Sequence, residues 1–218
     1  MKFINENLET IDHENTEITE QYLAETFIQE NDVVFELGAR YGTVSCIINK
    51  KLKNKKNQVV VEPDSAVWDA LEQNKLNNDC EFYIVKGFVS NTKMSLTEDG
   101  YSSTCFQDAG SKIESFTIDD IKRTTGINAP FNVLVADCEG FLETFFDENP
   151  TFYDCLRLIL FEADLPEKCN YTKIVNRLAD LGFVNIMRGH QNAWLRPCED
   201  NRTILNRLFS GDLVLKSS

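Results

Sequence analysis

The 218-residue chain has few of the residues that mark metal-binding or disulfide-rich proteins. It contains two histidines, and its seven cysteines are scattered without a CxxC pair, so we expect neither a zinc site nor a disulfide framework. No apolar run approaches the roughly 20 residues that a membrane span needs, and the first residues do not form a long apolar signal region. These absences predict an untargeted protein of the reducing cytosol that binds no membrane.

Basic residues are also scarce. Lys and Arg total 22 against 35 Asp and Glu, which gives a net charge of −13. This sign opposes binding to a phosphate backbone, so nucleic acid is not an expected partner. The length and the 42% hydrophobic content favour one domain. We expect a polar leader at 1–16 and a single domain at 17–218, and the sequence leaves the oligomeric state open.

Short apolar runs alternate with segments of helical spacing along the chain. Helices are predicted at 18–28, 43–52, 65–76, 118–125 and 171–181. The pattern predicts an α/β, Rossmann-like fold with helices on both faces of a mostly parallel sheet and an antiparallel hairpin at its edge. The polar segment 90–115 is expected to be an irregular loop that acts as a lid. The seven predicted strands are Val33–Leu37, Val59–Val61, Phe82–Val89, Phe131–Ala136, Leu156–Phe161, Phe183–Met187 and Ala193–Leu195.

Acidic residues stand at the ends of four predicted parallel strands. Open parallel sheets bind ligands beyond the carboxyl ends of their strands, so these acids are expected to surround one cleft. Such a cleft suits a cation or a ligand rich in hydroxyl groups. The acids are Glu36, Glu62, Asp137 with Glu139, and Glu162 with Asp164.

The turn after the first predicted strand carries Gly38 and Gly42 with three residues between them, unlike the GxGxxG pattern of dinucleotide-binding folds. Gly38 allows a close backbone approach, and the next helix offers its N-terminal amides to a carboxylate. Glu62 follows at the separation expected of an acid that accepts both ribose hydroxyls. Ribose, a carboxylate, an ammonium and a sulfonium together describe S-adenosylmethionine, whose positive groups favour acids such as Glu36 and Asp137.

On these residues the sequence resembles the FkbM-type S-adenosylmethionine-dependent methyltransferases, from about Val33 to Leu195. That family has a D/E-x-G-x-x-x-G turn after the first strand and a Glu-Pro pair after the second, matched here by Glu36 to Gly42 and by Glu62-Pro63. The family's Thr-Leu-Asp, Asp-x-Glu-Gly and final Glu are matched by 117–119, 137–140 and Glu162. Arg40, Tyr41 and 87–88 depart from the family pattern.

The resemblance implies a seven-stranded methyltransferase fold and O-methylation of a hydroxyl, commonly on a sugar or natural product. The expected partner is therefore a small-molecule or glycan acceptor that bears a hydroxyl group. An acidic cleft favours a neutral polyol over a phosphorylated acceptor, because like charges repel. The predicted cofactor-binding residues are Glu36, Gly38, Ala39, Arg40, Gly42, Glu62, Pro63, Gly87, Phe88 and Asp137.

Methyl transfer to an alcohol needs a base within hydrogen-bond reach of the hydroxyl. We expect Asp137 to be the cofactor-side acid and Glu139 the acceptor-side base, with His190 as the other candidate base. Glu139 could instead cap the following helix. A divalent cation is a further possibility, held by Asp137, Glu162 and Asp164. Tyr101, Phe106 and Trp194 could stack on a sugar, although a tryptophan within a strand is more often core.

Two other classes of function stay open at this point. A nicotinamide-dependent oxidoreductase shares the strand, turn, helix and ribose-binding acid, but this chain lacks its phosphate-binding glycine pattern. The second alternative is a non-catalytic module with a cofactor fold that binds a partner protein through segment 90–115. The cofactor that binds, if any, separates the three hypotheses.

Overall fold

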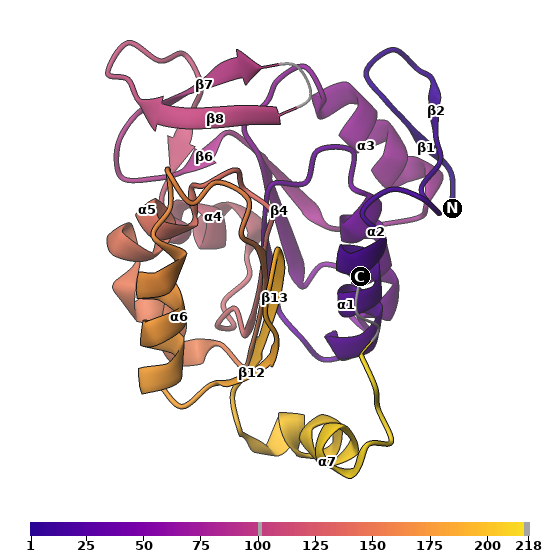
Figure 1. The fold of residues 1–218 in the computed structure, drawn as a ribbon. Coiled ribbons are helices and arrows are strands. Elements are labelled where there is room, and N and C mark those ends of the chain that lie inside the picture. The colour runs from indigo at the N-terminus through magenta and orange to yellow at the C-terminus, as the bar shows by residue number, and fades with distance from the viewer. Residues whose placement is uncertain (100–101, 216–218) are drawn as a thin grey trace.

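The computed structural model describes residues 1–99 and 102–215, and its centre is a seven-stranded sheet (Figure 1). The strands are β3 (Val34–Leu37), β4 (Gln58–Glu62), β5 (Tyr83–Lys86), β10 (Val133–Ala136), β11 (Leu158–Glu162), β12 (Val184–Met187) and β13 (Gln191–Leu195). Their order across the sheet is β12-β13-β11-β10-β3-β4-β5. Neighbours from β5 to β11 pair in parallel, whereas β13 is antiparallel to both β11 and β12. The predicted sheet and its edge hairpin are confirmed.

Helices cover both faces of this sheet, which explains why its central strands are apolar on both sides. On one face lie α1 (Ile18–Phe27), α2 (Thr43–Lys51) and α3 (Trp68–Asn77), and on the other lie α4 (Ile118–Thr125), α5 (Leu142–Glu148) and α6 (Tyr171–Asp180) (Figure 1). In β3, Val34 packs with α1 and α2, whereas Phe35 packs with α5. The alternation of side chains along each strand thus supplies both layers of the core.

The predicted helices are found within a few residues of their expected bounds. Thr117 begins α4 with a capping box, in which its hydroxyl accepts from the Asp120 amide and the Asp120 carboxylate accepts from the Thr117 amide. The helix expected after Glu139, whose bounds the sequence patterns did not predict, is α5. The sequence patterns did not indicate α7 (Arg202–Ser210) or the short 3-10 helices Pro150–Cys155 and Glu199–Asn201. Among the described helices, none combines the length and the apolar character needed to cross a bilayer.

Two local predictions were wrong between residues 82 and 116. The expected strand Phe82–Val89 is broken at Gly87, where φ is +152° and a Cβ would lie 2.3 Å from the Glu114 carbonyl oxygen. The chain therefore leaves the main sheet, and β6 (Phe88–Val89) pairs in parallel with β9 (Ser115–Phe116). The segment between them is not irregular, because β7 (Met94–Asp99) and β8 (Ser102–Gln107) form an antiparallel hairpin at the upper edge of Figure 1.

The segment predicted as a polar leader, 1–16, packs on the domain. It contains the antiparallel pair β1 (Phe3–Ile4) and β2 (Thr10–Ile11). Phe3 is fully buried in a cluster with Leu71 and Phe82. The Asn74 side chain accepts a hydrogen bond from the Ile4 amide and donates one to the Ile4 carbonyl. One aromatic residue in an acidic segment carries too little periodicity to reveal this packing.

A buried ion pair joins β11 to the turn before β3. The guanidinium of Arg157 donates to both carboxylate oxygens of Asp32, and it also reaches Asn201 Oδ1 at 2.6 Å and the Phe27 carbonyl at 3.0 Å. The Gln29 amide and the Asn132 side chain donate to the same carboxylate. The guanidinium thus donates four hydrogen bonds and the carboxylate accepts four, which compensates for the burial of both charges.

We expect Arg157→Ala to lower the free energy of unfolding by about 3–5 kcal/mol, because it leaves the Asp32 carboxylate buried without its charge partner. Urea unfolding followed by circular dichroism measures the change. The control is Lys173→Ala, which removes exposed ion pairs of α6 with Glu143 and Asp147 of α5 and should cost far less. Equal losses in the two variants would contradict the prediction.

Candidate functional site

A cavity opens at the carboxyl ends of β3, β4 and β10, where the sequence placed the cleft. The start of α1 and the β7–β8 hairpin complete its wall through Glu17, Glu20, Leu96 and Cys105. Apolar side chains form part of the lining, among them Phe88, Val89, Phe141 and Phe161. Charged side chains of the lining are the carboxyls Glu17, Glu20, Glu36, Glu62, Asp64, Asp137 and Glu139 and the cation Arg40.

Glu62, the last residue of β4, holds the glycine-containing turn that follows β3, from Gly38 to Gly42 (the β3 turn). Its Oε2 accepts from the amides of Ala39 at 3.1 Å and Arg40 at 2.7 Å, and its Oε1 accepts from the Asp64 amide at 2.8 Å. Only 6% of Glu62 is exposed, and this burial raises its carboxyl pKa against the effect of the three amides. A carboxylate offers about four acceptor positions, so one further hydrogen bond fits here.

Glu36 lines the cavity but turns its carboxyl toward α2. Its two oxygens accept from Ser45 Oγ at 2.8 Å and from Gln58 Nε2 at 3.0 Å, and the residue is 1% exposed. Burial, with smaller contributions from the nearby carboxyls of Glu17 and Asp137, raises its pKa to about 8 against the effect of the two hydrogen bonds. Glu36 is therefore mainly uncharged at neutral pH.

Asp137, Glu162 and His190 lie in a row across three neighbouring strands. Ala136 of β10 pairs with Phe161 of β11, which places Asp137 beside Glu162, and Glu162 pairs with Gln191 of β13, next to His190. Burial and the Glu162 carboxyl raise the pKa of Asp137 to about 9, so Asp137 is mainly protonated at neutral pH. His190 Nε2 contacts Glu162 Oε1.

Glu139 forms a second carboxyl pair, with Asp164. Burial, together with a hydrogen bond to Asp164, raises the pKa of Glu139 to about 8. The Tyr171 hydroxyl and the Leu165 amide donate to Asp164 Oδ1, at 2.7 and 2.8 Å. Glu139 has a left-handed backbone, with φ of 49°, directly before Gly140. Its side chain lines the cavity, and no side-chain cap to α5 is present, so the capping alternative is not supported.

The structure separates the predicted site residues into two groups. Gly42 and Gly87 are not part of the lining of the described cavity and have backbone roles: Gly42 begins α2 at φ 76°, and Gly87 ends β5. His190 is also outside the lining, with its side chain 65% exposed. The others, namely Glu36, Gly38, Ala39, Arg40, Glu62, Pro63, Phe88, Asp137 and Glu139, line the cavity.

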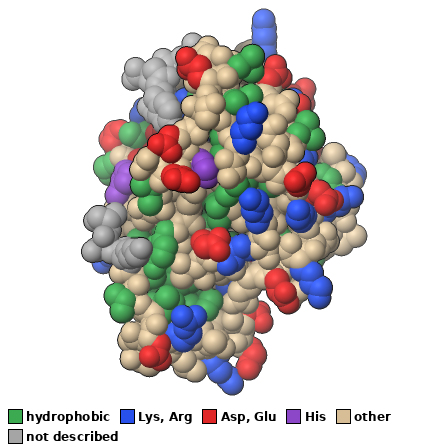
Figure 2. Space-filling view, turned by 90° about the vertical axis from the view of Figure 1, so that its right-hand side faces the viewer, with side chains coloured by type: hydrophobic (Ala, Val, Ile, Leu, Met, Phe, Trp, Pro, Cys, Tyr) green, Lys and Arg blue, Asp and Glu red, His purple; other side chains and the backbone are tan. Residues whose placement is uncertain are grey.

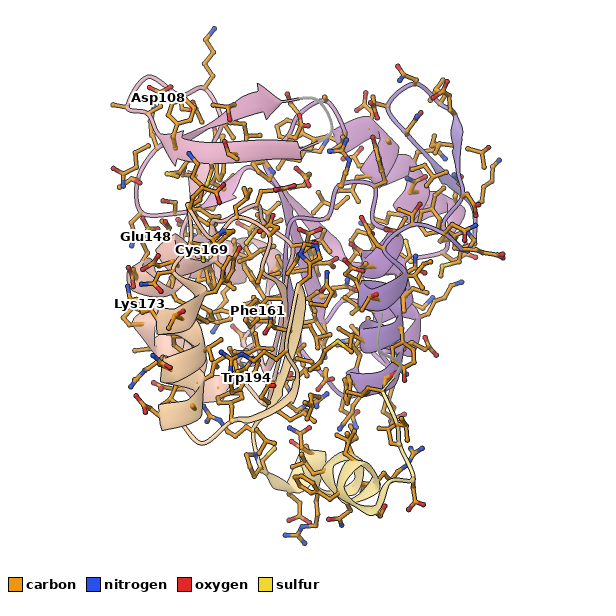
Figure 3. The ribbon with its side chains drawn as sticks, in the orientation of Figure 1. Asp108, Glu148, Phe161, Cys169, Lys173 and Trp194 are labelled. Carbon is orange, nitrogen blue, oxygen red and sulfur yellow. The ribbon has the colours of Figure 1, made fainter. Side chains whose placement is uncertain are left out.

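Two further expectations need correction. Within residues 1–99 and 102–215, no three His, Cys, Asp or Glu side chains are placed to hold a metal ion, so Asp137, Glu162 and Asp164 do not form such a group. Trp194 is buried in the core on the α6 side of the sheet (Figure 3) and cannot stack on a ligand. Phe106 lies outside the cavity lining, and Tyr101 lies outside the described residues.

Sequence reasoning missed the contributions of α1 and of the hairpin. Glu17 precedes α1, and Gln191 Nε2 donates to Glu20 Oε1 at 2.6 Å, so the helix start adjoins the edge hairpin. Neither Glu17 nor Glu20 follows a predicted strand, and a position directly after a strand was the signal by which the other acids of the cavity were predicted. The alternation of Met94 and Leu96 with polar neighbours could have indicated a strand, although polar residues dominate that segment.

No protein-family model and no curated protein sequence matches the chain. Among solved structures, a precorrin-6y C5,15-methyltransferase from Geobacter metallireducens is similar over 83% of this chain and 89% of that chain, with 14% identity and a TM-score of 0.51. The chain has the Rossmann-like fold of class I methyltransferases.

An O-methyltransferase from Bacillus cereus, solved in complex with SAH, shares 11% identity over 85% of this chain and 84% of that chain, with a TM-score of 0.48. An rRNA methylase from Streptococcus thermophilus shares 9% identity over 81% and 92%, with a TM-score of 0.49. The likeness to the precorrin-6y methyltransferase, at 14% identity, shows the fold alone and leaves the acceptor open.

The buried acids predict that the ligand-free protein loses stability as pH rises. Glu36 is protonated in the folded state up to about pH 8 but ionises near 4.5 when unfolded, so its contribution is complete below about 4.5 and lost between these values. Glu36→Gln should flatten the decrease in melting temperature between pH 5 and pH 8. Thermal melts at both pH values measure this, and the exposed Glu25→Gln serves as control. An unchanged pH dependence in Glu36→Gln would refute it.

Proposed function

We propose that the domain of residues 17–218, with segment 1–16 packed on it, is an S-adenosylmethionine-dependent methyltransferase. The observation that carries the proposal is the buried Glu62 carboxylate, which holds the β3 turn and keeps one acceptor position for a ribose hydroxyl. The class I methyltransferase fold supports the same cofactor. The seven cysteines are free thiols, which supports a reducing, cytosolic compartment.

The cavity suits the chemistry of this cofactor. Pro63, Phe88 and Val89 supply apolar walls for the adenine beside Glu62. Carboxyls outnumber the cation Arg40 in the lining of the described cavity, and this favours a ligand with a sulfonium and an ammonium group. A dinucleotide would bring two phosphates among these acids. The residues therefore fit S-adenosylmethionine better than a nicotinamide dinucleotide.

Each acid at the end of β10 has a distinct role in the proposed reaction. When bound, the cofactor supplies an electrophilic methyl group attached to a positively charged sulfur. Asp137 places a carboxyl beside that charge, with Glu162 of β11 behind it outside the cavity lining, while Glu139 accepts the proton of the acceptor hydroxyl. Asp164, itself held by Tyr171, orients Glu139. We assign His190 no contact with the acceptor, because its ring lies against Glu162 outside the cavity lining.

For the acceptor we propose a neutral hydroxyl compound, with a sugar or glycan favoured by the FkbM-like motifs. Neutral acceptors avoid the repulsion that the cavity acids would exert on a phosphorylated one. The net charge of −13 also opposes nucleic acid. Figure 2 shows Lys and Arg side chains scattered among acids on the face that it draws, rather than gathered into one basic patch.

Isothermal calorimetry with the full chain tests the cofactor. We expect S-adenosylmethionine and S-adenosylhomocysteine to bind and NADH not to bind. Glu62→Gln should weaken both by about tenfold or more, the value of one hydrogen bond to a charged group. The exposed Glu72→Gln, which only loses an ion pair with Lys86, is the control. Binding of NADH alone would indicate an oxidoreductase, and binding of none of the three would favour a non-catalytic module.

Transfer of a labelled methyl group to a panel of polyols and glycans tests the base. Glu139→Gln should keep cofactor affinity within about twofold and lose about 100-fold or more in turnover, since a positioned base contributes at least that factor. In the wild type, kcat/KM should rise with pH up to about 8, because Glu139 must lose its proton first.

The matched control for Glu139→Gln is Asp147→Asn, an exposed acid of α5 that contacts Lys173 instead of the cavity. Its turnover should equal that of the wild type. Undiminished turnover in Glu139→Gln would remove Glu139 from the role of base.

A further inference from the structure

Glu17 lines the cavity, although it lies before a helix and not at the end of a strand. It directly precedes α1, at the position where a side chain usually caps its own helix, yet it makes no such cap. Its carboxylate instead accepts from the hydroxyl of Thr43, the first residue of α2. The side chain is thereby held in the cavity wall beside Glu36.

Glu17 and Glu62, the proposed ribose-binding residue, lie on opposite sides of the β3 turn. Glu62 stands at the end of β4, on one side of the β3 turn. Helix α1 packs against α2, β11 and β13, on the other side of that turn. A ligand whose ribose lies at Glu62 and whose sulfur lies near Asp137 extends across the end of β3 toward the start of α1.

Arg40 supplies the opposite charge close by. It belongs to the turn that leads into α2, three residues before the Thr43 that holds Glu17. Its guanidinium lies over the Tyr41 ring at 4.9 Å, and its charge opposes the rise that burial causes in the Glu17 pKa. Both side chains line the cavity, so a cation and an anion lie at this end, together with the Glu20 carboxyl that accepts from Gln191.

An α-amino-acid head carries an ammonium and a carboxylate on one carbon, so it needs an anion and a cation side by side. We propose that Glu17 and Arg40 bind the amino-acid head of the cofactor, with Glu17 accepting from the ammonium and Arg40 facing the carboxylate. This rests on the proposed function. It makes Glu17 a binding residue that no strand-end motif contains.

The competing explanation is purely structural. The contact between Glu17 and Thr43 joins the starts of α1 and α2, and these helices pack on each other. A residue that only joins the helices would affect every ligand of the cavity alike. A ligand without the amino-acid head therefore separates the two explanations.

Calorimetry with three probes makes this test: S-adenosylmethionine, S-adenosylhomocysteine and 5′-methylthioadenosine, which lacks the amino-acid head. We expect Glu17→Gln to weaken the first two by about tenfold or more and to leave methylthioadenosine within about twofold. Arg40→Gln should give the same pattern. The exposed Glu14→Gln, on the same segment, should bind all three as the wild type does.

Methylthioadenosine binding also reports that a variant has kept its fold. Equal weakening of all three ligands in Glu17→Gln overturns the inference in favour of the structural role. Unchanged affinity for all three overturns it as well. If the wild type binds none of the three, the proposed function fails, whereas wild-type binding with an unaffected Glu17→Gln removes this inference alone.

Discussion

The Glu62 carboxylate is the interaction on which the geometry of the site depends. Removing a carboxylate from water costs several kcal/mol unless donors replace the lost hydration. Here the amides of Ala39, Arg40 and Asp64 replace it, and in doing so they fix the β3 turn against the end of β4. The turn is thus shaped before any ligand arrives, and a preformed site loses less entropy on binding.

The acids around this turn act as pairs rather than as independent charges. Asp137 beside Glu162, and Glu139 beside Asp164, keep their protons to a higher pH than free carboxyls, because burial and the neighbouring acids oppose their ionisation. An empty cavity therefore carries less negative charge than its sequence suggests. A cationic ligand reverses the balance by stabilising the ionised carboxyls, so the charge of the site adjusts to its contents.

The sequence allowed the sheet and the acids at its edge to be predicted, since both depend on patterns local in the chain. Runs such as Val133–Ala136 are strands because they are buried on both faces, and acids directly after them must meet at one edge. Glu17 escaped prediction because its place depends on how α1 packs. The β7–β8 hairpin escaped because its polar residues resemble a loop. His190 was placed in the correct turn, but its contact with Glu162 depends on strand register.

Gly38 has a consequence for how the site can change. A Cβ at this position would lie 1.6 Å from the carbonyl oxygen of Asp137, and the Asp137 amide donates to Leu37. The main chains of two strand-end turns therefore touch directly, without side chains between them. The backbone therefore sets the distance between the turn after β3 and the turn after β10. This distance does not depend on which side chains surround the two turns. A change in what the cavity admits must therefore come from the side chains of its wall, such as Leu96 and Cys105 of the hairpin.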